Sequence, residues 1–479
     1  MYLKMSFISF VKDSLSKSDV KFKKLSIIAF IATILCIIIP NYTVLSPAAV
    51  RILVIFISTM VCIILEICNP IVLLLLAVTC ASLSKTIDVR MGFSGFSNTV
   101  PWLLFIVLSL AKTISSSTLG LRLAYLFMKY FGGSIIGLSY SILLTEVVIG
   151  PLLPSNTARA ASIGMPLVKS LSQYISCNVK NVSEKTIGTY LSFLYICGNA
   201  MTSGLFLTAM LSNALVIDVV EPLGLHVTWM SWFKYMVIPY ITFLLIVPFI
   251  LQLICKTNVK DLSKLKVLAA NNYEELGAIS NKEKLIIFVF LGMLVLWILS
   301  EFINIPIMTT ALIGLSIFIF TGILNIKDIL SSYGTFSSVM LLGLIISLVN
   351  CLIDLKVIDW FSTIISNSVC DFSKTTVFIL LTIIYYFAQY FFTSESSKIM
   401  ALFAPFLSAG IAIGIDAKVL AITLTAFSSA SDVLGSYVCP SALTFYSSGY
   451  LTLKQWMYYG IIIAICFLLI WYTYVWMFF

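Results

Sequence analysis

Charged residues are scarce in this chain. Asp, Glu, Lys and Arg make up 10% of its 479 residues, whereas a typical soluble domain carries about 25%. Hydrophobic residues make up 60%, and the mean hydropathy is +1.08. A soluble fold could not bury so much apolar surface, and repeated apolar runs approach the roughly 20 residues that cross a bilayer. The composition therefore predicts an all-α polytopic membrane protein.

Histidine is almost absent, and cysteine is not clustered. The chain has one histidine, His226, and its eleven cysteines include no Cys-x-x-Cys pair. A zinc or iron centre needs clustered ligands, so we expect no metal centre and no organic cofactor. We interpret His226 as a loop residue and the cysteines as small apolar side chains within helices. A membrane-embedded enzyme is disfavoured for the same reason, because it would gather His, Asp or Cys at membrane depth.

The positive charge does not predict a nucleic-acid partner. The formal net charge is +9, but nearly half of the lysines lie in residues 1–24 and 256–284. Lysine-rich segments stay on the cytoplasmic side of a membrane. We therefore expect a cytoplasmic basic N-terminal segment at 1–24 and a cytoplasmic linker at 256–284. Six predicted crossings between them return the chain to the cytoplasm, in agreement with this orientation.

These segments divide the apolar runs into two membrane halves, residues 25–255 and 285–479. The first half has an unusual break, in which Gly-Pro-Leu-Leu-Pro precedes Ser155, Asn156 and Thr157. Proline disfavours helix at the residue before it, and Ser, Asn and Thr cap a helix that restarts. A polar, non-helical tip is tolerated at membrane depth only where protein or a watery cavity encloses it. We predict a re-entrant hairpin near 134–166 whose tip is part of a transport site.

The second half repeats this pattern at a constant spacing. Ser394-Glu395-Ser396 interrupts an apolar pair 239 residues after the first break, which predicts a second hairpin near 375–407. Phe96-Ser97-Asn98 and Phe336-Ser337-Ser338 each precede a long apolar run, 240 residues apart. A broken helix and a hairpin in each half are typical of secondary transporters with inverted-topology repeats.

Several stretches resemble a known family, the divalent anion–sodium symporters. PSNTARA at 154–160, preceded by Glu146, resembles the first signature of that family, in particular of its citrate/succinate antiporter and 2-oxoglutarate/malate translocator branch. YFFTSESSKIMALFAPFL at 390–407 resembles its second hairpin, and YSSGYLTLKQWMYYG at 446–460 its closing signature. The resemblance implies about eleven transmembrane helices plus two re-entrant hairpins, a homodimer, and elevator movement of the domain that carries the substrate.

Neutral donors at the two tips are the expected substrate ligands. A restarting helix directs free N–H groups and partial positive charge at an anion, and hydroxyl and amide groups add donors without fixed charge. The residues that we predict to bind carboxylates are Ser155, Asn156, Thr157, Ser394, Glu395 and Ser396. A role as helix caps alone is the alternative. Candidates for an unwound turn or an ion site are Thr202, Ser203, Asn213, Ser428, Ser429 and Asp432, with sodium left open as a coupling ion.

The charges near the second tip depart from the family pattern. Glu395 and Lys398 can pair at i,i+3, but Glu395 could instead carry a proton or meet a cationic group of the substrate. Asp432 stands where the branch has glycine, and an acid there would repel a carboxylate. Near the first tip, Arg159 either attracts the anion at long range or snorkels to the cytoplasmic face. Lys112 and Glu146 are the other deep charges.

The predicted function is secondary active transport of di- or tricarboxylates, in the form of dicarboxylate exchange by an elevator mechanism, in a multi-pass protein of a bacterial inner membrane. The alternative within transport is a sodium-coupled or proton-coupled symporter of sulfate or an amino-dicarboxylate. A channel is disfavoured, because two equivalent hairpins suit alternating access better than a permanent pore. The expected partners are small carboxylates, membrane lipids and a second copy of the chain.

Overall fold

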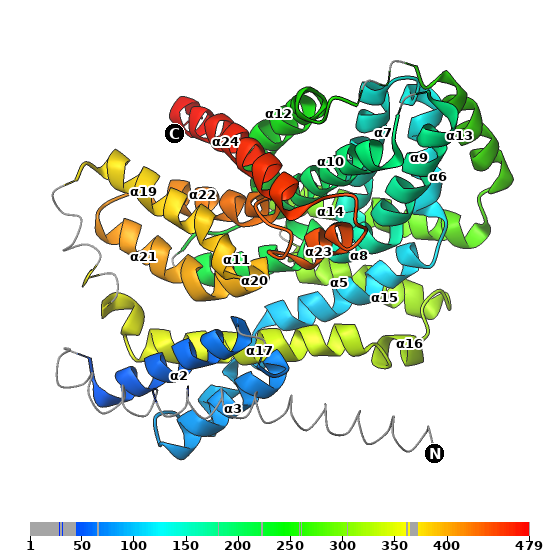
Figure 1. Ribbon diagram of the computed structural model, residues 1–479. Coiled ribbons are helices and arrows are strands. Elements are labelled where there is room, and N and C mark those ends of the chain that lie inside the picture. The colour runs from blue at the N-terminus through cyan, green and yellow to red at the C-terminus, as the bar shows by residue number, and fades with distance from the viewer. Residues whose placement is uncertain are drawn as a thin grey trace, which may run out of the picture. The chain divides into compact units, whose positions relative to one another are not determined.

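The computed structural model contains only helices and irregular segments in the part of the chain that it describes (Figure 1). The described residues are 28, 31, 45–64, 67–180, 182–221, 224–257, 259, 261–303, 305–360, 363–364 and 372–478. The predicted all-α fold class is confirmed for these residues. The basic segment 1–24 lies outside them.

The chain packs into two compact units. One consists of Met1–Pro101 and Phe336–Ser368, and the other of Trp102–Thr335 and Val369–Phe479. Each unit therefore takes residues from both consecutive halves of the sequence. The predicted division into halves before and after the linker therefore differs from the division into packed units.

The smaller unit contains α2, Pro47–Ile64; α3, Pro70–Leu83; α4, Val89–Gly92; and most of α17, Tyr333–Asp354. Asn69 caps α3, since its side chain accepts a hydrogen bond from the Ile71 N–H. The Gly95 N–H donates to Ser347 Oγ on α17 at 2.9 Å. Gly95 lies so close to α17 that an added Cβ would collide with the Gly343 carbonyl. The segment at 94–97 thus packs directly on the helix of the second half.

The larger unit holds the two hairpins and most of the other helices. Its helices are α5, Thr99–Ser115 (from Trp102); α6, Leu119–Phe131; α7, Ile135–Ile149; α8, Asn156–Arg159; α9, Met165–Asn178; α10, Glu184–Leu205; α11, Leu211–Val220; α12, Trp229–Cys255; α13, Ser263–Glu275; α14, Asn281–Ile303; α15, Ile307–Phe320; α16, Ile326–Leu330; α19, Lys374–Phe387; α20, Glu395–Lys398; α21, Ala404–Ala412; α22, Ala417–Ala430; α23, Pro440–Tyr446; and α24, Leu453–Phe478. At its centre lies α10, where every residue from Ile187 to Leu205 is buried. This helix packs against α7, α9, α12 and α22. The first hairpin thus packs directly on α10, and α22, which follows the second hairpin, packs on the same helix.

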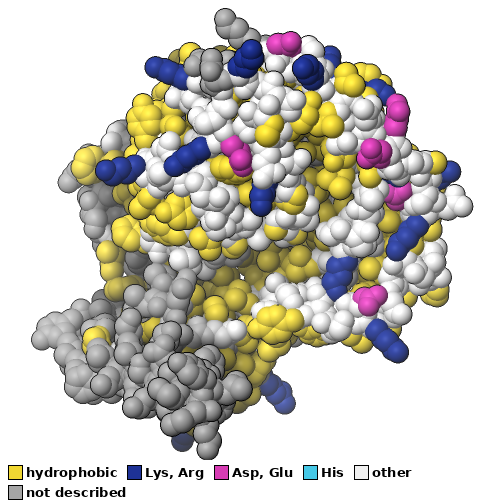
Figure 2. All heavy atoms as spheres, turned by 45° about the vertical axis from the view of Figure 1, so that its right-hand side comes forward, with side chains coloured by type: hydrophobic (Ala, Val, Ile, Leu, Met, Phe, Trp, Pro, Cys, Tyr) yellow, Lys and Arg dark blue, Asp and Glu magenta, His cyan; other side chains and the backbone are white. Residues whose placement is uncertain are grey.

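Five helical segments of the described chain are long and apolar enough to cross a membrane: Ile135–Leu152, Trp229–Cys255, Tyr333–Asp354, Lys374–Phe391 and Leu453–Phe478. A sixth span results if α5 and α6, which are bent by 59° at their junction, count as one. Large side chains such as Phe320, which is 91% exposed, lie on the surface, and Figure 2 shows apolar side chains over much of the visible face. Such a surface suits contact with lipid. The total of eleven spans and the inverted orientation of the halves remain predictions.

The hydrophilic linker is more ordered than the sequence suggested. Part of it forms α13, which packs on α6. Arg122 on α6 donates from Nη1 to the Gly277 carbonyl and from Nη2 to the Leu276 carbonyl, both at 2.7 Å. Its Nε lies 3.3 Å from Glu283 Oε1. Arg122 therefore fastens the end of the linker to the membrane half that precedes it.

Candidate functional site

The first helix break lies where the prolines and polar residues placed it. Helix α7 ends at Ile149, a 3-10 turn covers Gly150–Leu152, and the chain stays non-helical to Ser155. Ser155 caps the restarting helix, since its Oγ accepts from the Ala158 N–H at 3.2 Å. Helix α8 then continues through a π-helical segment, Ala160–Gly164, into α9.

The second break repeats the first, element for element. Helix α19 ends at Phe387, a 3-10 turn follows, and Ser394 caps α20 by accepting from the Ser397 N–H at 3.2 Å. A π-helical segment, Ile399–Phe403, connects α20 to α21. Both cap serines and both π-helical segments are 239 residues apart, which is the spacing seen in the sequence. The cap role of Ser155 and Ser394 is thus observed, and their role as substrate ligands stays a prediction.

Arg159, at the end of α8, is fully buried. Its Nε lies 3.0 Å from Glu146 Oε2, and its Nη1 donates to the carbonyls of Leu153 at 2.6 Å and Ala209 at 2.8 Å. The snorkelling alternative is therefore wrong: the guanidinium has partners for its donors inside the protein and does not reach the surface. Its Nη2 completes this set by donating to Ser203 Oγ at 2.7 Å.

The Glu146 carboxylate has equally complete partners. Besides Arg159 it accepts from the Tyr195 hydroxyl and from Asn199 Nδ2 at 3.1 Å. Asn199 Nδ2 also lies 3.2 Å from the Asn156 carbonyl at the hairpin tip. This network connects α7, α8 and α10, and it holds the first tip in place. Tyr195 and Asn199 were missed by the sequence analysis, although both are polar groups on a helix expected at membrane depth.

Lys398 occupies the equivalent position in the second hairpin, 239 residues after Arg159, and is also fully buried. Its Nζ donates to the Phe427 carbonyl at 3.2 Å and to Ser431 Oγ at 2.6 Å, and lies 4.7 Å from the centre of the Tyr385 ring. Among the described residues no carboxylate lies within ion-pair distance of this amine. The predicted Glu395–Lys398 salt bridge is therefore not formed, because the lysine turns instead to a carbonyl, a hydroxyl and an aromatic face.

Two acids close to this lysine are buried with incomplete hydrogen bonding. Glu395 is 5% exposed and Asp432 is 1% exposed. Both oxygens of Glu395 and Oδ1 of Asp432 lack a hydrogen-bond partner. The other oxygen of Asp432, Oδ2, lies 3.4 Å from Asn156 Nδ2. The structure thus brings together predicted site residues from the first tip and from the polar turn that follows the second hairpin.

The chain is unwound after α10, next to the candidates Thr202 and Ser203 and before Asn213. Helix α10 ends at Leu205, and α11 begins at Leu211 after a 3-10 turn. Asn213 Nδ2 donates to the carbonyls of Ser203 at 2.8 Å and Phe206 at 3.0 Å, so the side chain holds the turn together. The buried Thr202 hydroxyl has no hydrogen-bond partner. Ion binding at this turn stays a prediction.

Ser428 and Ser429 each pair with a tyrosine of another helix. Ser428 Oγ lies 2.7 Å from the Tyr385 hydroxyl, and Ser429 Oγ lies 2.7 Å from the Tyr240 hydroxyl. Thr157 and Ser396 are partly exposed in the tips. Lys112, expected to be deep, donates to the Asp328 carbonyl at 2.5 Å. That contact is exposed, so Lys112 is no part of the buried site.

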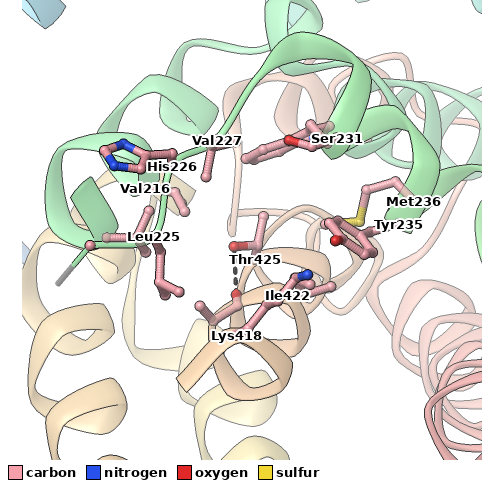
Figure 3. Close-up of a pocket in the computed structure, with 14 residues that line it drawn as sticks. Val216, Leu225, His226, Val227, Ser231, Tyr235, Met236, Lys418, Ile422 and Thr425 are labelled. Atoms are coloured by element: carbon pink, nitrogen blue, oxygen red, sulfur yellow. Dashed lines mark hydrogen bonds between the residues drawn. The ribbon is translucent and has the colours of Figure 1, made fainter. Parts of the chain in front are cut away.

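A separate cavity of about 240 Å³ lies between α12, α22 and the loop that follows α11 (Figure 3). Its lining is largely apolar, and Lys418 Nζ lies 4.8 Å from the centre of the Tyr235 ring at its edge. His226 is exposed in the loop, as expected. None of the predicted site residues lines this cavity, so it is distinct from the hairpin tips.

The family described as "Sodium:sulfate symporter transmembrane region" matches residues 19–479 of this chain. The chain belongs to this family. It is the divalent anion–sodium symporter family that the motifs of the two hairpins resemble. The matched residues include both membrane halves and the linker between them, so the two halves belong to a single family region.

Named members of the sodium:sulfate symporter family are similar to most of this chain. Dicarboxylate transporter 1, chloroplastic, of Spinacia oleracea is 31% identical over 436 residues, covering 90% of this chain and 77% of that protein. The L-tartrate/succinate antiporter of Escherichia coli (strain K12) is 28% identical over 384 residues, covering 79% and 78%. The relatives thus place the chain in the dicarboxylate branch of the symporter family.

A solved structure shares the fold. Neisseria gonorrhoeae MtrF, described in work on a class of antimetabolite efflux pumps, aligns with a TM-score of 0.55 over 80% of this chain and 82% of that chain. The two sequences are 13% identical. At that identity the match shows that this chain and MtrF share a fold, and it does not bear on the substrate of this chain.

Proposed function

We propose that this protein is a secondary transporter of dicarboxylates that exchanges one carboxylate for another. Membership of the sodium:sulfate symporter family supports transport rather than catalysis. The named substrates of the relatives, dicarboxylates in one and tartrate and succinate in the other, support the substrate class. The observation that carries the proposal is the pair of capped helix breaks at a constant spacing of 239 residues.

The substrate binds between the two tips. Asn156 and Thr157 of the first tip and Ser396 of the second are partly exposed and offer amide and hydroxyl donors. A charged group at the bilayer centre costs at least about 2.5–3.5 kcal/mol, so an anion needs such donors to cross. Neutral donors also release their ligand, which an exchanger requires. The buried Arg159 does not bind the substrate, because Glu146 neutralises it and holds it in the network behind the tip.

The movement and the assembly belong to the same proposal. The hairpin-bearing unit moves as an elevator, in a homodimer embedded in a bacterial inner membrane with its N-terminus in the cytoplasm. The two compact units support a division of labour between a moving and a static part.

A second candidate is a symporter that couples an anion to sodium or protons. The description of the family, a sodium:sulfate symporter, and the buried acids Glu395 and Asp432 favour it. Sulfate or an amino-dicarboxylate would then be the substrate. Uptake driven by sodium without any internal anion would support this candidate and reject exchange.

Proteoliposome uptake tests the proposal. Labelled malate, succinate, 2-oxoglutarate, citrate and sulfate are each offered with and without sodium, and with and without internal counter-substrate. We expect uptake of the dicarboxylates that depends on an internal dicarboxylate and is insensitive to sodium. Uptake of none of these carboxylates would overturn the proposal.

A further inference from the structure

The buried charges at the second tip do not balance. Glu395, Lys398 and Asp432 are all at least 95% buried, so two acids face one base. If all three are ionised, the cluster carries one negative charge in a part of the protein without bulk water. An isolated buried charge is strongly unfavourable unless it is paired and hydrogen-bonded. A doubly charged carboxylate brought to the same place would raise the local charge to minus three.

The hydrogen bonds show which atoms lack a partner. Lys398 is satisfied by a carbonyl and a hydroxyl, whereas three of the four carboxylate oxygens have no partner. The Ser212 hydroxyl on α11 is 1% exposed, lies beside the Glu395 carboxylate outside hydrogen-bond geometry, and has no other partner. Buried polar groups in native proteins are nearly always paired. The unpaired carboxylate oxygens therefore stand to gain from a proton, because a protonated carboxyl can donate a hydrogen bond where a carboxylate can only accept one.

We propose that the Glu395–Asp432 pair binds a proton when the carrier takes up its dicarboxylate, so that each anion crosses with a proton in both directions of the exchange; this inference rests on the proposed function. The proton comes from water on the side from which the substrate binds and returns to water on the other side. No covalent bond to the substrate forms or breaks.

The contact between Asn156 and Asp432 couples the two events. Asn156 Nδ2 lies 3.4 Å from Asp432 Oδ2 in the structure. A substrate carboxylate that takes over this amide donor leaves Asp432 without its hydrogen bond while bringing negative charge close to it. Both effects favour the neutral form of the acid. Proton uptake thus accompanies anion binding, and proton release accompanies anion release.

A proton fits this place better than a sodium ion. Sodium needs several oxygen ligands, and the positive Lys398 is close enough to act electrostatically on both acids. A proton needs a single lone pair and no cavity, and Glu395, which is 5% exposed, has two oxygens without a hydrogen-bond partner.

Other titratable groups surround the pair. Those that face it are Lys398 on α20, Tyr240 on α12, Tyr385 and Tyr386 on α19, and Cys439 before α23. Helix α22 contributes the exposed Lys418 at its other end, the π-helical segment contributes none, and the acid of α11, Asp218, has no described side chain. Phenols and thiols are neutral near pH 7, so the groups that can exchange a proton there with the substrate are the two carboxylates and the Lys398 amine. The double variant described below distinguishes the carboxylates from the amine, because it keeps Lys398.

Calorimetry counts the proton directly. Succinate binding to the purified full-length protein is measured at pH 7.5 in two buffers of different ionisation enthalpy, each with and without sodium. We expect uptake of about one proton per succinate, independent of sodium, and a Kd that rises about tenfold per pH unit between pH 6.5 and 8.5. The double variant E395Q/D432N should take up no proton and show a flat pH profile. The control Glu221→Gln removes an exposed acid of the loop and should behave like the wild type.

The outcomes distinguish failure of the proton-binding inference from failure of the proposed dicarboxylate transport. Succinate binding without proton uptake in the wild type, or a double variant that keeps the wild-type proton count, overturns the inference and leaves the proposed function standing. Tighter binding of aspartate than of succinate, again without proton uptake, also overturns it, because the ammonium group then supplies the missing charge. Absence of any dicarboxylate binding or uptake by the wild type contradicts the proposed function itself. If the double variant does not fold, the wild-type count and the single variants E395Q and D432N decide, since at least one of them should lower the count.

Discussion

The two hairpin tips carry a buried cation at equivalent positions, but only the first cation meets a carboxylate. Arg159 has an ion pair 3.0 Å long and neutral partners for its remaining nitrogens. Lys398 has two neutral partners and an aromatic face, while the acids beside it keep unpaired oxygens. The same local framework therefore supports a rigid, charge-balanced tip in one half and an unbalanced one in the other. We infer that the first tip positions the substrate and the second responds to it.

Breaking the first tip should have the largest effect. Glu146→Gln leaves Arg159 as an unpaired buried charge, and loss of one partner of a buried pair costs about 3–5 kcal/mol. We expect a large fall in the apparent Tm of the purified protein and no transport. Glu301→Gln breaks an ion pair of similar length whose lysine is 61% exposed, and should cost at most about 1 kcal/mol. Equal losses in the two variants would contradict a structural role for the Glu146–Arg159 pair.

Removing the link between the tips comes next. Asn156→Ala deletes the predicted substrate donor and the hydrogen bond to Asp432 but leaves the Arg159 network intact. We expect succinate exchange to fall at least about tenfold, because a hydrogen bond to a charged group contributes about 1.5–3 kcal/mol. The apparent Tm should stay near the wild-type value. Ser162→Ala, an exposed change on the same helical run, is the control and should transport normally. Full transport by Asn156→Ala would remove the central site assignment.

Substitutions of the two cap serines should lower stability less than the changes above, and they test whether each serine also binds the substrate. Ser155→Ala and Ser394→Ala should each lower stability by about 0.5–2 kcal/mol, whereas glycine at either position should cost only a few tenths. If a serine serves as a cap alone, its glycine variant keeps transport. If its hydroxyl also binds the substrate, alanine and glycine variants lose transport alike. Exchange assays on the four variants, with Tm measured in parallel, separate the two roles at each tip.

The smallest effect concerns the linker, far from either tip. Burial alone would raise the pKa of Glu283, but hydrogen bonds from Thr118 and Ser280 and the charge of Arg122 outweigh it and lower the pKa from 4.5 to about 2. A lowered pKa means that Glu283 stabilises the docked linker above about pH 4.5, and that this contribution disappears as the pH falls toward 2. Spin labels on α13 and α6 should stay at a constant distance from pH 7 to 5 and separate in Glu283→Gln at pH 7. An unchanged distance in that variant would show that packing alone holds α13.

Local chemistry made the breaks predictable from sequence. Proline and serine act on their own neighbours, so the positions of both tips and their spacing of 239 residues could be found without a structure. The predicted second membrane half, 285–479, contains most of the apolar helix α14 and all of α15 for the same reason, since hydropathy is a property of the segment itself.

The partners of buried charges could not be predicted in this way. Arg159 lies close in sequence to Glu146, but its contacts with Ser203 and Ala209 depend on how α10 packs behind the hairpin. The i,i+3 spacing suggested a Glu395–Lys398 pair, but the Lys398 amine donates to Phe427 on α22 and to Ser431 on the 3-10 turn that follows it. For both Arg159 and Lys398 the sequence shows only a single basic residue within an apolar stretch. That pattern indicates that the buried charge has a partner, but it does not identify the partner residue.

The π-helical segments Ala160–Gly164 and Ile399–Phe403 begin directly after Arg159 and Lys398. A π turn holds one residue more than the α-helix around it, and such turns are rare and are frequently found at functional sites. The extra residue changes the direction in which the following side chains point. The short helices that carry the two buried cations are therefore set apart from the longer helices behind them, and a shift of either tip would not have to move the whole hairpin arm.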